Sequence, residues 1–191
     1  MAWHDRLLRG QASSESRPDP AGQPYHATRG GARVEPLHFR RVAGRFATGV
    51  TVLTTGTVEQ PHGMTANSFT SVSLRPPLIL VCVDRRRVTH GRILQAGRFG
   101  VSVLGADQQA ISEFFAGQRA ALAPGSLEVV PGVTGVPLIA GALAHLECRV
   151  VDVFPGGDHS IFVAQVEHAA VGESQAPLIF FGGQYARLAP G

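Results

Sequence analysis

The 191-residue sequence contains no lysine and only two cysteines, Cys82 and Cys148. Each cysteine lies inside an apolar, strand-like run, so a small buried side chain explains both better than one disulfide does. The chain also lacks an apolar run long enough for a secretion signal or a membrane span. We therefore expect a protein of the reducing cytoplasm that does not bind a membrane.

The motifs of several common chemistries are missing as well. There is no G-x-G-x-x-G, no G-x-x-x-x-G-K-[ST] and no G-x-S-x-G, which excludes a Rossmann dinucleotide motif, a P-loop and a hydrolase elbow. The eight histidines form no H-E-x-x-H, and there is no C-x-x-C, so we expect no metal site. The net charge of +3 includes one run of three arginines, residues 85–87, which favours an anionic small molecule over nucleic acid.

The composition indicates one globular domain with an extension. Hydrophobic residues make up 44% of the chain and charged residues 16%, as in soluble domains of this length. Residues 1–34 are rich in serine, proline and glycine without sustained apolar periodicity, so we expect a flexible N-terminal extension and a folded domain over residues 35–191. Alternatively, Trp3, Leu7 and Leu8 form a short helical turn that docks on the domain or on a partner subunit.

The stretch 62–84 changes character halfway along its length. Its first half interleaves short polar and apolar side chains, which predicts a half-exposed strand and loop lining a polar pocket. The short polar residues are Thr65, Asn67, Ser68, Thr70, Ser71 and Ser73. Arg75-Pro76-Pro77 then forces a turn, and residues 78–83 are expected to form a fully buried strand. That strand ends at Asp84, directly before the three arginines, whose forked donors suit phosphate oxygens.

The remaining periodicities predict a mainly β fold with a few helices. A helix begins at Pro36, carries the apolar stripe Phe39, Val42, Ala43, Phe46 and Ala47, and stops at Gly49. Further helices are expected at residues 89–95 and 107–115, and strands at 50–55, 99–104, 137–153 with a bend at Gly141, 159–168 and 178–181. The glycine-rich residues 117–135 form either a lid or a surface excursion. Such strands with hairpin-like connections indicate a closed antiparallel barrel, which also removes exposed strand edges.

The stretch 62–84 carries a resemblance to a known family. It contains G-M-T-x-x-S-F-x-S-V-S at residues 63–73, then x-P-P-L-x-L-x-C-V, then a charged turn. Further matches follow in order at residues 97–104, 141–144, 157–159 and 177–182. Over roughly residues 37–188 the chain resembles the flavin reductase family with the FMN-binding split-barrel fold, and six separated matches in register are a specific signal.

The resemblance implies a fold, an activity and partners. It implies a closed antiparallel split β-barrel that uses NADH or NADPH to reduce FMN or FAD and supplies the reduced flavin to a partner monooxygenase. It also implies a homodimer, because family members place the flavin near a subunit interface. The alternative is a split-barrel protein that holds FMN as a fixed redox group or has a non-catalytic flavin-binding role.

Site residues also follow from the resemblance. The flavin-binding segments correspond to Gly63, Met64, Thr65, Cys82, Val83, Asp84, Val88, Thr89 and Phe115. The nicotinamide-side positions correspond to Asn67, Ser68, His159 and Tyr185, among which His159 is the candidate catalytic residue. We add Ser73 from the polar run and Arg85 as a phosphate ligand to the cofactor-binding set. Family members often have a serine where Arg87 stands, so Arg87 either replaces that contact or points to solvent.

The residue types suit hydride transfer between two cofactors. That chemistry belongs to the nicotinamide and the flavin, so the protein needs to stack them and requires no nucleophile. Gly63 lets the backbone approach a flat ring, Met64 or Phe69 can cover a ring face, and Thr65 and Ser68 can donate to ligand oxygens. Asp158 precedes His159, but neighbours on a strand point to opposite faces, so a pair of the two would require a turn.

Overall fold

The computed structural model describes residues 34–118, 121–173 and 176–188. β-Branched and apolar runs dominate these ranges. These residues belong to one compact unit that spans residues 33–191. Apart from Val34, the predicted extension over residues 1–34, with its possible docking turn, lies outside the described residues. No helix in the described ranges is long and apolar enough to cross a membrane.

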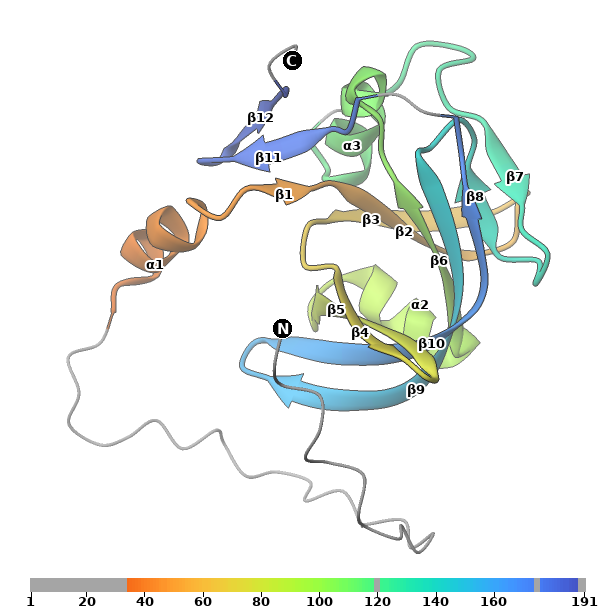
Figure 1. Cartoon of the computed structure of the whole chain (residues 1–191), viewed down its shortest axis with the longest axis horizontal. Coiled ribbons are helices and arrows are strands. Elements are labelled where there is room, and N and C mark those ends of the chain that lie inside the picture. Colours follow the sequence, from red (N-terminus) through yellow and green to blue (C-terminus); the bar gives the residue numbers. More distant parts are fainter. Residues whose placement is uncertain (1–33, 119–120, 174–175, 189–191) are drawn as a thin grey trace, which may run out of the picture. The chain divides into compact units, whose positions relative to one another are not determined.

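Short helices interrupt a chain that is otherwise mostly strands in the described ranges (Figure 1). The helical elements are α1 (Pro36–Ala43), α2 (Val88–Ala96), the 3-10 turn η1 (Ala106–Gln108) and α3 (Gln109–Phe115). The strands are β1 (Thr48–Gly49), β2 (Thr51–Gly56), β3 (Pro61–Ala66), β4 (Thr70–Leu74), β5 (Pro77–Asp84), β6 (Arg98–Val103), β7 (Val129–Pro131), β8 (Pro137–Ile139), β9 (Ala144–Gly156), β10 (His159–Val171), β11 (Ile179–Phe181) and β12 (Gln184–Ala186). The expected mainly β fold is confirmed.

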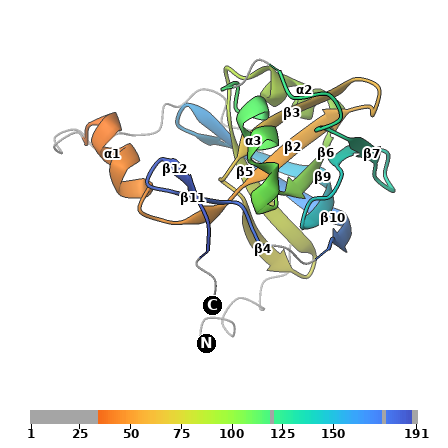
Figure 2. The ribbon, with the colours of Figure 1, turned by 90° about the horizontal axis from the view of Figure 1, so that it is seen from above.

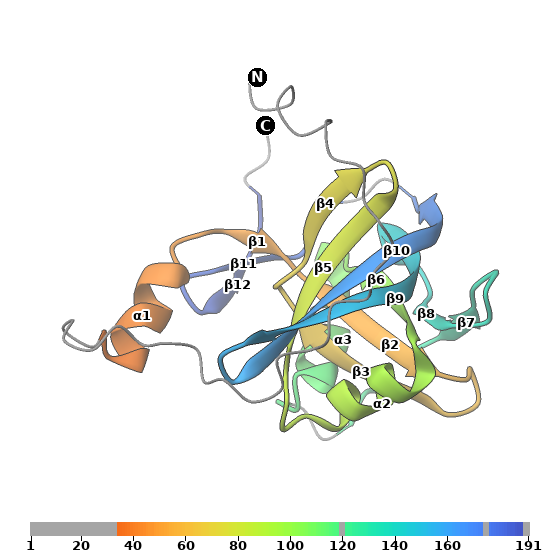
Figure 3. The same ribbon diagram turned by 90° about the horizontal axis from the view of Figure 1, so that it is seen from below.

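The largest sheet is antiparallel and has two free edges. Its order is β3-β2-β6-β9-β10-β5-β4, and Figure 3 shows β4, β5, β10 and β9 side by side. The expected closed barrel is not confirmed, because no hydrogen-bonded ladder joins the edge strands β3 and β4 in the described chain. Residues 67–69 link these two edges directly, so the sheet curls until its edges approach without pairing.

Strand β2 separates two apolar cores. Val52 and Leu53 are both fully buried, and as neighbours on a strand they point to opposite faces. Leu53 packs in the core that includes Ile93 of α2, whereas Val52 packs in the core that includes Ile111 of α3. Figures 1 and 2 show α2 and α3 on opposite sides of β2. Because helices of seven to nine residues are not stable alone, this packing holds them in place.

Strand β5 is buried on one face only. Ile79, Val81 and Val83 are at most 3% exposed, whereas the alternate residues Leu78 and Leu80, with Cys82, are half-buried. The expectation of a fully buried strand over residues 78–83 is therefore wrong. The reason is the antiparallel sheet: β5 lies between β10 and β4, and only its inner face meets the core.

Glycines and one buried carboxylate shape the connections. Gly97 adopts φ 64° and ends α2 as expected. Gly141, with φ 69°, interrupts the predicted run 137–153, which becomes the separate strands β8 and β9. The excursion over residues 117–135 is tied down near its end, because Glu147 accepts hydrogen bonds from the backbone N–H groups of Val133 (2.8 Å) and Thr134 (2.6 Å). Burial alone would raise the pKa of Glu147, but these bonds and the Thr134 hydroxyl hold it below its ordinary value.

Candidate functional site

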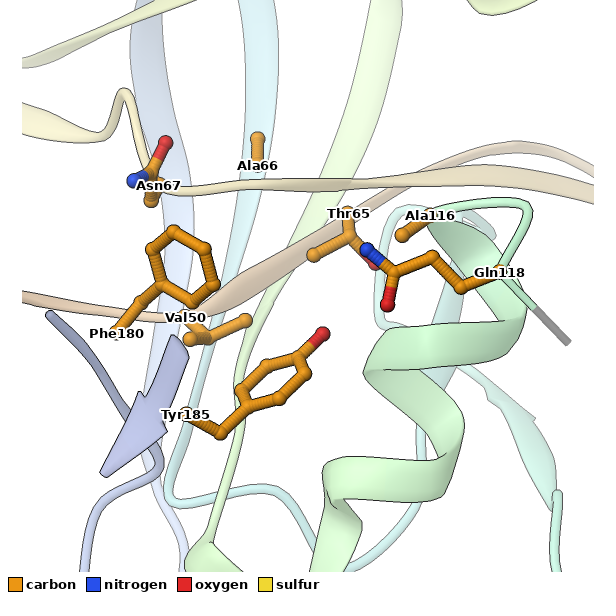
Figure 4. A pocket seen from close by; sticks show the side chains of 8 residues that line it. All are labelled: Val50, Thr65, Ala66, Asn67, Ala116, Gln118, Phe180 and Tyr185. Atoms are coloured by element: carbon orange, nitrogen blue, oxygen red, sulfur yellow. The ribbon is translucent and has the colours of Figure 1, made fainter. Parts of the chain in front are cut away.

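One end of the candidate site is a cavity of about 130 Å³, here called the aromatic pocket. Its lining comes from the β1–β2 junction, the end of β3, the residues after α3 and the hairpin β11–β12: Val50, Thr65, Ala66, Asn67, Ala116, Gln118, Phe180 and Tyr185. Figure 4 shows Phe180 on the side of Asn67 and the Tyr185 hydroxyl directed toward Thr65 and Gln118. The structure thus brings together three residues predicted from the sequence, namely Thr65, Asn67 and Tyr185.

Two hydroxyl groups of the aromatic pocket are held by Ser112, a fully buried residue of α3. The Ser112 hydroxyl lies 2.8 Å from Tyr185 Oη, and Thr65 Oγ1 donates to the Ser112 carbonyl at 2.6 Å. Since the Thr65 proton is already donated, Thr65 can only accept a hydrogen bond from a ligand, contrary to the expected donor role. The Phe180 and Tyr185 rings meet edge to face at 5.5 Å, which orients the tyrosine.

Gly63 and Phe115 are in direct contact at the floor of the site. A Cβ on Gly63 would lie 2.8 Å from Phe115 Cε1 and 3.0 Å from the Leu53 carbonyl oxygen. The absence of a side chain at Gly63 therefore allows the Phe115 ring to lie against β3. This contact places two predicted flavin-binding residues side by side.

Ser68 joins the β3–β4 connection to β5. Its hydroxyl accepts a hydrogen bond from the Cys82 N–H and donates one to the Cys82 carbonyl, both at 3.0 Å. The backbone ladder between β4 and β5 stops at Thr70↔Leu80, so the Ser68 side chain continues it where the strand has ended. The Ser68 hydroxyl, predicted to face a ligand, is thus hydrogen-bonded to the backbone N–H and carbonyl of Cys82.

The other end of the site is a strand-end cluster that consists of Asp84, Arg85, Arg86, Asp158 and His159. Arg86 binds both carboxylate oxygens of Asp84, at 3.1 and 2.8 Å, and this pairing holds the pKa of Asp84 far below its usual range. Arg85 Nε donates to the His159 carbonyl at 3.2 Å, and the Arg85 N–H donates to the Asp158 carbonyl at 3.2 Å. Arg86 is therefore engaged by Asp84, whereas the terminal nitrogens of Arg85 have no described partner.

The side chains of Asp158 and His159 form a hydrogen-bonded pair, although neighbours on a regular strand point to opposite faces. His159 Nδ1 lies 2.7 Å from Asp158 Oδ1, and this contact lowers the pKa of Asp158. Asp158 lies in the turn before β10 begins at His159, so the alternation of side chains does not apply to it. A carboxylate partner at Nδ1 favours a proton on that nitrogen and leaves Nε2 directed elsewhere.

The first turn of α2 provides backbone donors next to this cluster. Its N-cap residue is Arg87, whose side chain makes no capping hydrogen bond, so the N–H groups of Val88 and Thr89 have no side-chain cap. Val88 is exposed, whereas Thr89 is buried. His62 Nε2 lies 2.9 Å from Thr89 Oγ1, which ties β3 to α2. Burial, with Arg92 as a second cause, lowers the pKa of His62, and the neutral ring suits a site that binds through Thr89.

Some predicted residues face away from this surface. The Val83 side chain is fully buried, so only its backbone is free to meet a ligand, and Met64 packs partly against the core. Ser73 accepts a hydrogen bond from the Arg75 N–H and pairs with Leu78, six residues along β5 from Asp84, which is roughly 20 Å. The structure therefore gives Ser73 a role in the β4–β5 turn and does not bring it to the other site residues.

Sequence reasoning missed several residues that shape the site. Ser112 and Gln118 hold or line the aromatic pocket, and Val50 and Phe180 complete it. Two of the residues that shape the site had a local signal: His62 directly precedes the Gly63 motif, and Phe180 lies in the family match at residues 177–182. No described group of three or more histidine, cysteine, aspartate or glutamate residues is arranged to hold a metal ion.

Comparisons with known proteins show the family to which the chain belongs. Residues 43–189 match the family model described as flavin reductase like domain, and the chain belongs to this flavin reductase family. It is 46% identical over 158 residues to an NADH-dependent FAD reductase of Streptomyces globisporus, covering 81% of this chain and 86% of that protein. It is 37% identical over 161 residues to the reductase component of 4-nitrophenol 4-monooxygenase/4-nitrocatechol 2-monooxygenase of Rhodococcus opacus, covering 82% of this chain and 83% of that protein.

A solved structure shows the same likeness in three dimensions. The NADH:FAD oxidoreductase SgcE6 of Streptomyces globisporus C-1027, in complex with NAD and FAD fragments, superimposes with a TM-score of 0.74 at 44% identity. The match covers 84% of this chain and 98% of that one.

The contact between Gly63 and Phe115 yields a first prediction. In Gly63→Ala the new methyl group must displace Phe115 or β2, so we expect flavin affinity to fall about tenfold, or about 1.4 kcal/mol. Gly91→Ala in α2 is the matched control, because nothing lies within 4 Å of its Cβ position and alanine favours a helix. Flavin fluorescence titration of both variants measures the effect. If Gly63→Ala and the parent protein bind flavin with equal affinity, Gly63 does not contact the flavin.

Proposed function

We propose that this flavin reductase takes hydride from NADH or NADPH, transfers it to FMN or FAD, and supplies the reduced flavin to a separate monooxygenase. Its similarity to NADH-dependent flavin reductases and to a monooxygenase reductase component supports the reaction and the partner. The structural observations that carry the proposal are the bare Gly63 against Phe115, the Ser68–Cys82 link, and the first turn of α2, which has no side-chain cap. Strand β3, which carries Gly63, contacts both α3 and α2.

The residues on this surface fit a flavin. The bare Cα of Gly63 and the ring of Phe115 offer a flat apolar floor, and we assign the backbone of Cys82 and Asp84, at the end of β5, to the flavin's polar edge. At the far end, the N–H groups of Val88 and Thr89 and the free nitrogens of Arg85 suit a phosphate group. Arg86 is a less favourable phosphate ligand than Arg85, because its guanidinium already forms an ion pair with Asp84.

The chain contributes binding and orientation to the reaction. Bound flavin and nicotinamide supply the hydride chemistry themselves. We assign Asn67 and Tyr185 to the nicotinamide side, where the Ser112 bond fixes the tyrosine hydroxyl and Phe180 supplies an apolar wall. We assign His159 to positioning of the nicotinamide nucleotide. Asp158 at Nδ1 orients the ring, and Arg85 holds the backbone by donating to the His159 carbonyl. Nothing in this arrangement needs a nucleophile or a metal.

The release of reduced flavin separates the proposed function from a protein with a fixed cofactor. We expect steady-state NADH oxidation to depend saturably on added FMN or FAD, because a releasing reductase treats flavin as a substrate. Protein freed of flavin by gel filtration serves as the starting material. NADH oxidation that ignores added flavin, in a protein that stays yellow through gel filtration, would support the fixed-cofactor alternative instead.

His159 yields a prediction that distinguishes positioning from proton transfer. If it orients the nicotinamide nucleotide, His159→Ala should raise the KM for NADH about tenfold, or about 1.4 kcal/mol, and leave flavin affinity unchanged. A general acid would instead lower kcat with a pH dependence near the imidazole pKa. Stopped-flow reduction at several NADH concentrations measures both quantities. An unchanged reduction rate and unchanged NADH affinity would leave His159 a surface residue of the β9–β10 turn.

We also propose that two chains form a homodimer through the apolar face of α1. Every residue of α1 is exposed within the described chain, including Phe39 at 64% and Val42 at 58%, which share one face of the helix. The outer face of β5 and β10 is likewise apolar and half-buried, at Leu80, Cys82 and Ile161. A second copy that covers such patches is the economical explanation for large exposed apolar side chains.

Disruption of the α1 face tests the dimer. Phe39→Asp should convert the protein from the mass of two chains to that of one in light scattering after gel filtration, because a charge cannot be buried there without a partner. Val133→Asp is the control, since Val133 is 76% exposed in the turn before β8, away from α1. A parent protein with the mass of one chain at micromolar concentration would contradict the dimer.

Two finer assignments belong to the same proposal. We propose that the curled seven-stranded sheet is the split barrel of this family, with the β3–β4 connection held to β5 by the Ser68–Cys82 link. We propose a cytoplasmic location, because the free thiols of Cys82 and Cys148 suit a reducing compartment. Cell fractionation checks the location.

A further inference from the structure

A second pocket lies between the end of α1 and the turn of the hairpin β11–β12, and no step above uses it. It has a volume of about 260 Å³ and is here called the arginine pocket. Its lining consists of Leu37, Arg40, Arg41, Arg45, Gly182 and Gly183. Figure 1 shows α1 beside the tip of this hairpin.

The walls of the arginine pocket are joined to each other. The Gly182 N–H donates to the Gly44 carbonyl at 2.8 Å, which fastens the hairpin turn to the end of α1. The Arg45 guanidinium lies 6.0 Å from the centre of the Phe181 ring, a cation–π distance. Gly182 and Gly183 both have positive φ, 62° and 85°, so the turn requires glycine and exposes bare backbone to the pocket.

The charge of the arginine pocket is uncompensated among the described residues. No carboxylate lines it, and none of its three guanidinium groups has an ion pair with a described residue. Three other arginines of the domain are in ion pairs: Arg86 with Asp84, and Arg98 and Arg149 with Glu167. Three converging guanidinium forks beside bare backbone are suited to a phosphate-bearing anion, because each fork matches two oxygens.

The hairpin connects the arginine pocket to the aromatic pocket. Phe180 and Tyr185 are paired across β11 and β12 and line the aromatic pocket, whereas the turn residues Gly182 and Gly183 line the arginine pocket. Phe180 and Gly182 are two residues apart, a separation of roughly 7 Å along a strand. A ligand with a flat ring at one end and phosphates beyond a ribose can therefore reach both pockets around the hairpin tip.

We propose that the arginine pocket binds the pyrophosphate and adenylate half of a dinucleotide substrate. This inference rests on the proposed function, which supplies two dinucleotides with that chemistry, NAD(P)H and FAD. Arg40 and Arg41 hold the phosphates through their forks, and Arg45, braced on Phe181, closes the third side. The pocket is distinct from the proposed dimer face, because at 100° per residue Leu37, Arg40 and Arg41 lie opposite Phe39 and Val42 on α1.

Truncated substrates test the proposal. The variant Arg40→Gln/Arg41→Gln/Arg45→Gln is compared with Arg75→Gln, an exposed arginine in the β4–β5 turn. If the pocket serves the nicotinamide dinucleotide, the triple variant should show a KM for NADH at least about tenfold higher, with unchanged kcat. Its KM for reduced nicotinamide mononucleotide, which lacks the adenylate half, should not change. If the pocket serves FAD, the KM for FAD rises and that for FMN does not.

A binding measurement keeps this inference separate from the activity. ADP titrated into the parent protein by calorimetry should bind, with an affinity that falls as salt rises, and the triple variant should lose about tenfold or more of that affinity. Arg75→Gln should behave like the parent, and circular dichroism checks that the triple variant is folded. A parent protein that turns over but does not bind ADP, or a triple variant with all four KM values unchanged, overturns the proposal. Loss of transfer to a monooxygenase alone would assign the arginines to an acidic protein surface instead.

Discussion

The two hydrogen bonds between the Ser68 hydroxyl and the backbone of Cys82 hold the arrangement on which the site depends. The sheet is open between β3 and β4, and its β4–β5 ladder ends at Thr70↔Leu80. Ser68 supplies one more rung with a side chain, because a hydroxyl can accept from an N–H and donate to a carbonyl at once. That rung fixes the distance between the Gly63 strand and the end of β5. In the proposed function, that rung relates the floor for a flat ring at Gly63 to the proposed phosphate donors that follow β5.

Ion pairs hold several charged side chains of the domain in place. Asp84 engages Arg86, and Glu167 engages both Arg98 and Arg149. Such exposed pairs contribute little to stability, and their consequence is mainly to direct side chains. Arg85 is different, because it donates to the carbonyls of Asp158 and His159, and its terminal nitrogens have no partner among the described residues. A site that binds two cofactors and positions them has no need of an activated nucleophile, and the residues present are of the kind that bind and orient.

The turns and element ends that depend on proline or glycine could be predicted from the sequence. The turn at Arg75 and Pro76, the end of α2 at Gly97 and the interruption at Gly141 each follow from local backbone chemistry. Burial depends on which strands become neighbours, so the alternating exposure of β5 and the open edge between β3 and β4 could not be predicted. The same limit applies to the site. The Gly63 motif located β3, but Ser112 and Phe180 come from distant segments, and the Asp158–His159 pair depends on a turn that strand alternation does not describe.

The central claim is that flavin lies on the surface joining Gly63, the Ser68–Cys82 link and the first turn of α2. Hydrogen–deuterium exchange with and without FMN tests it most directly, because backbone N–H groups that meet or underlie a ligand exchange more slowly. The account predicts that FMN slows exchange in residues 63–68 and 82–89 and leaves β7 and β8, over residues 129–139, unchanged. Slowed exchange confined to segments outside these two, with residues 82–89 unaffected, would contradict it.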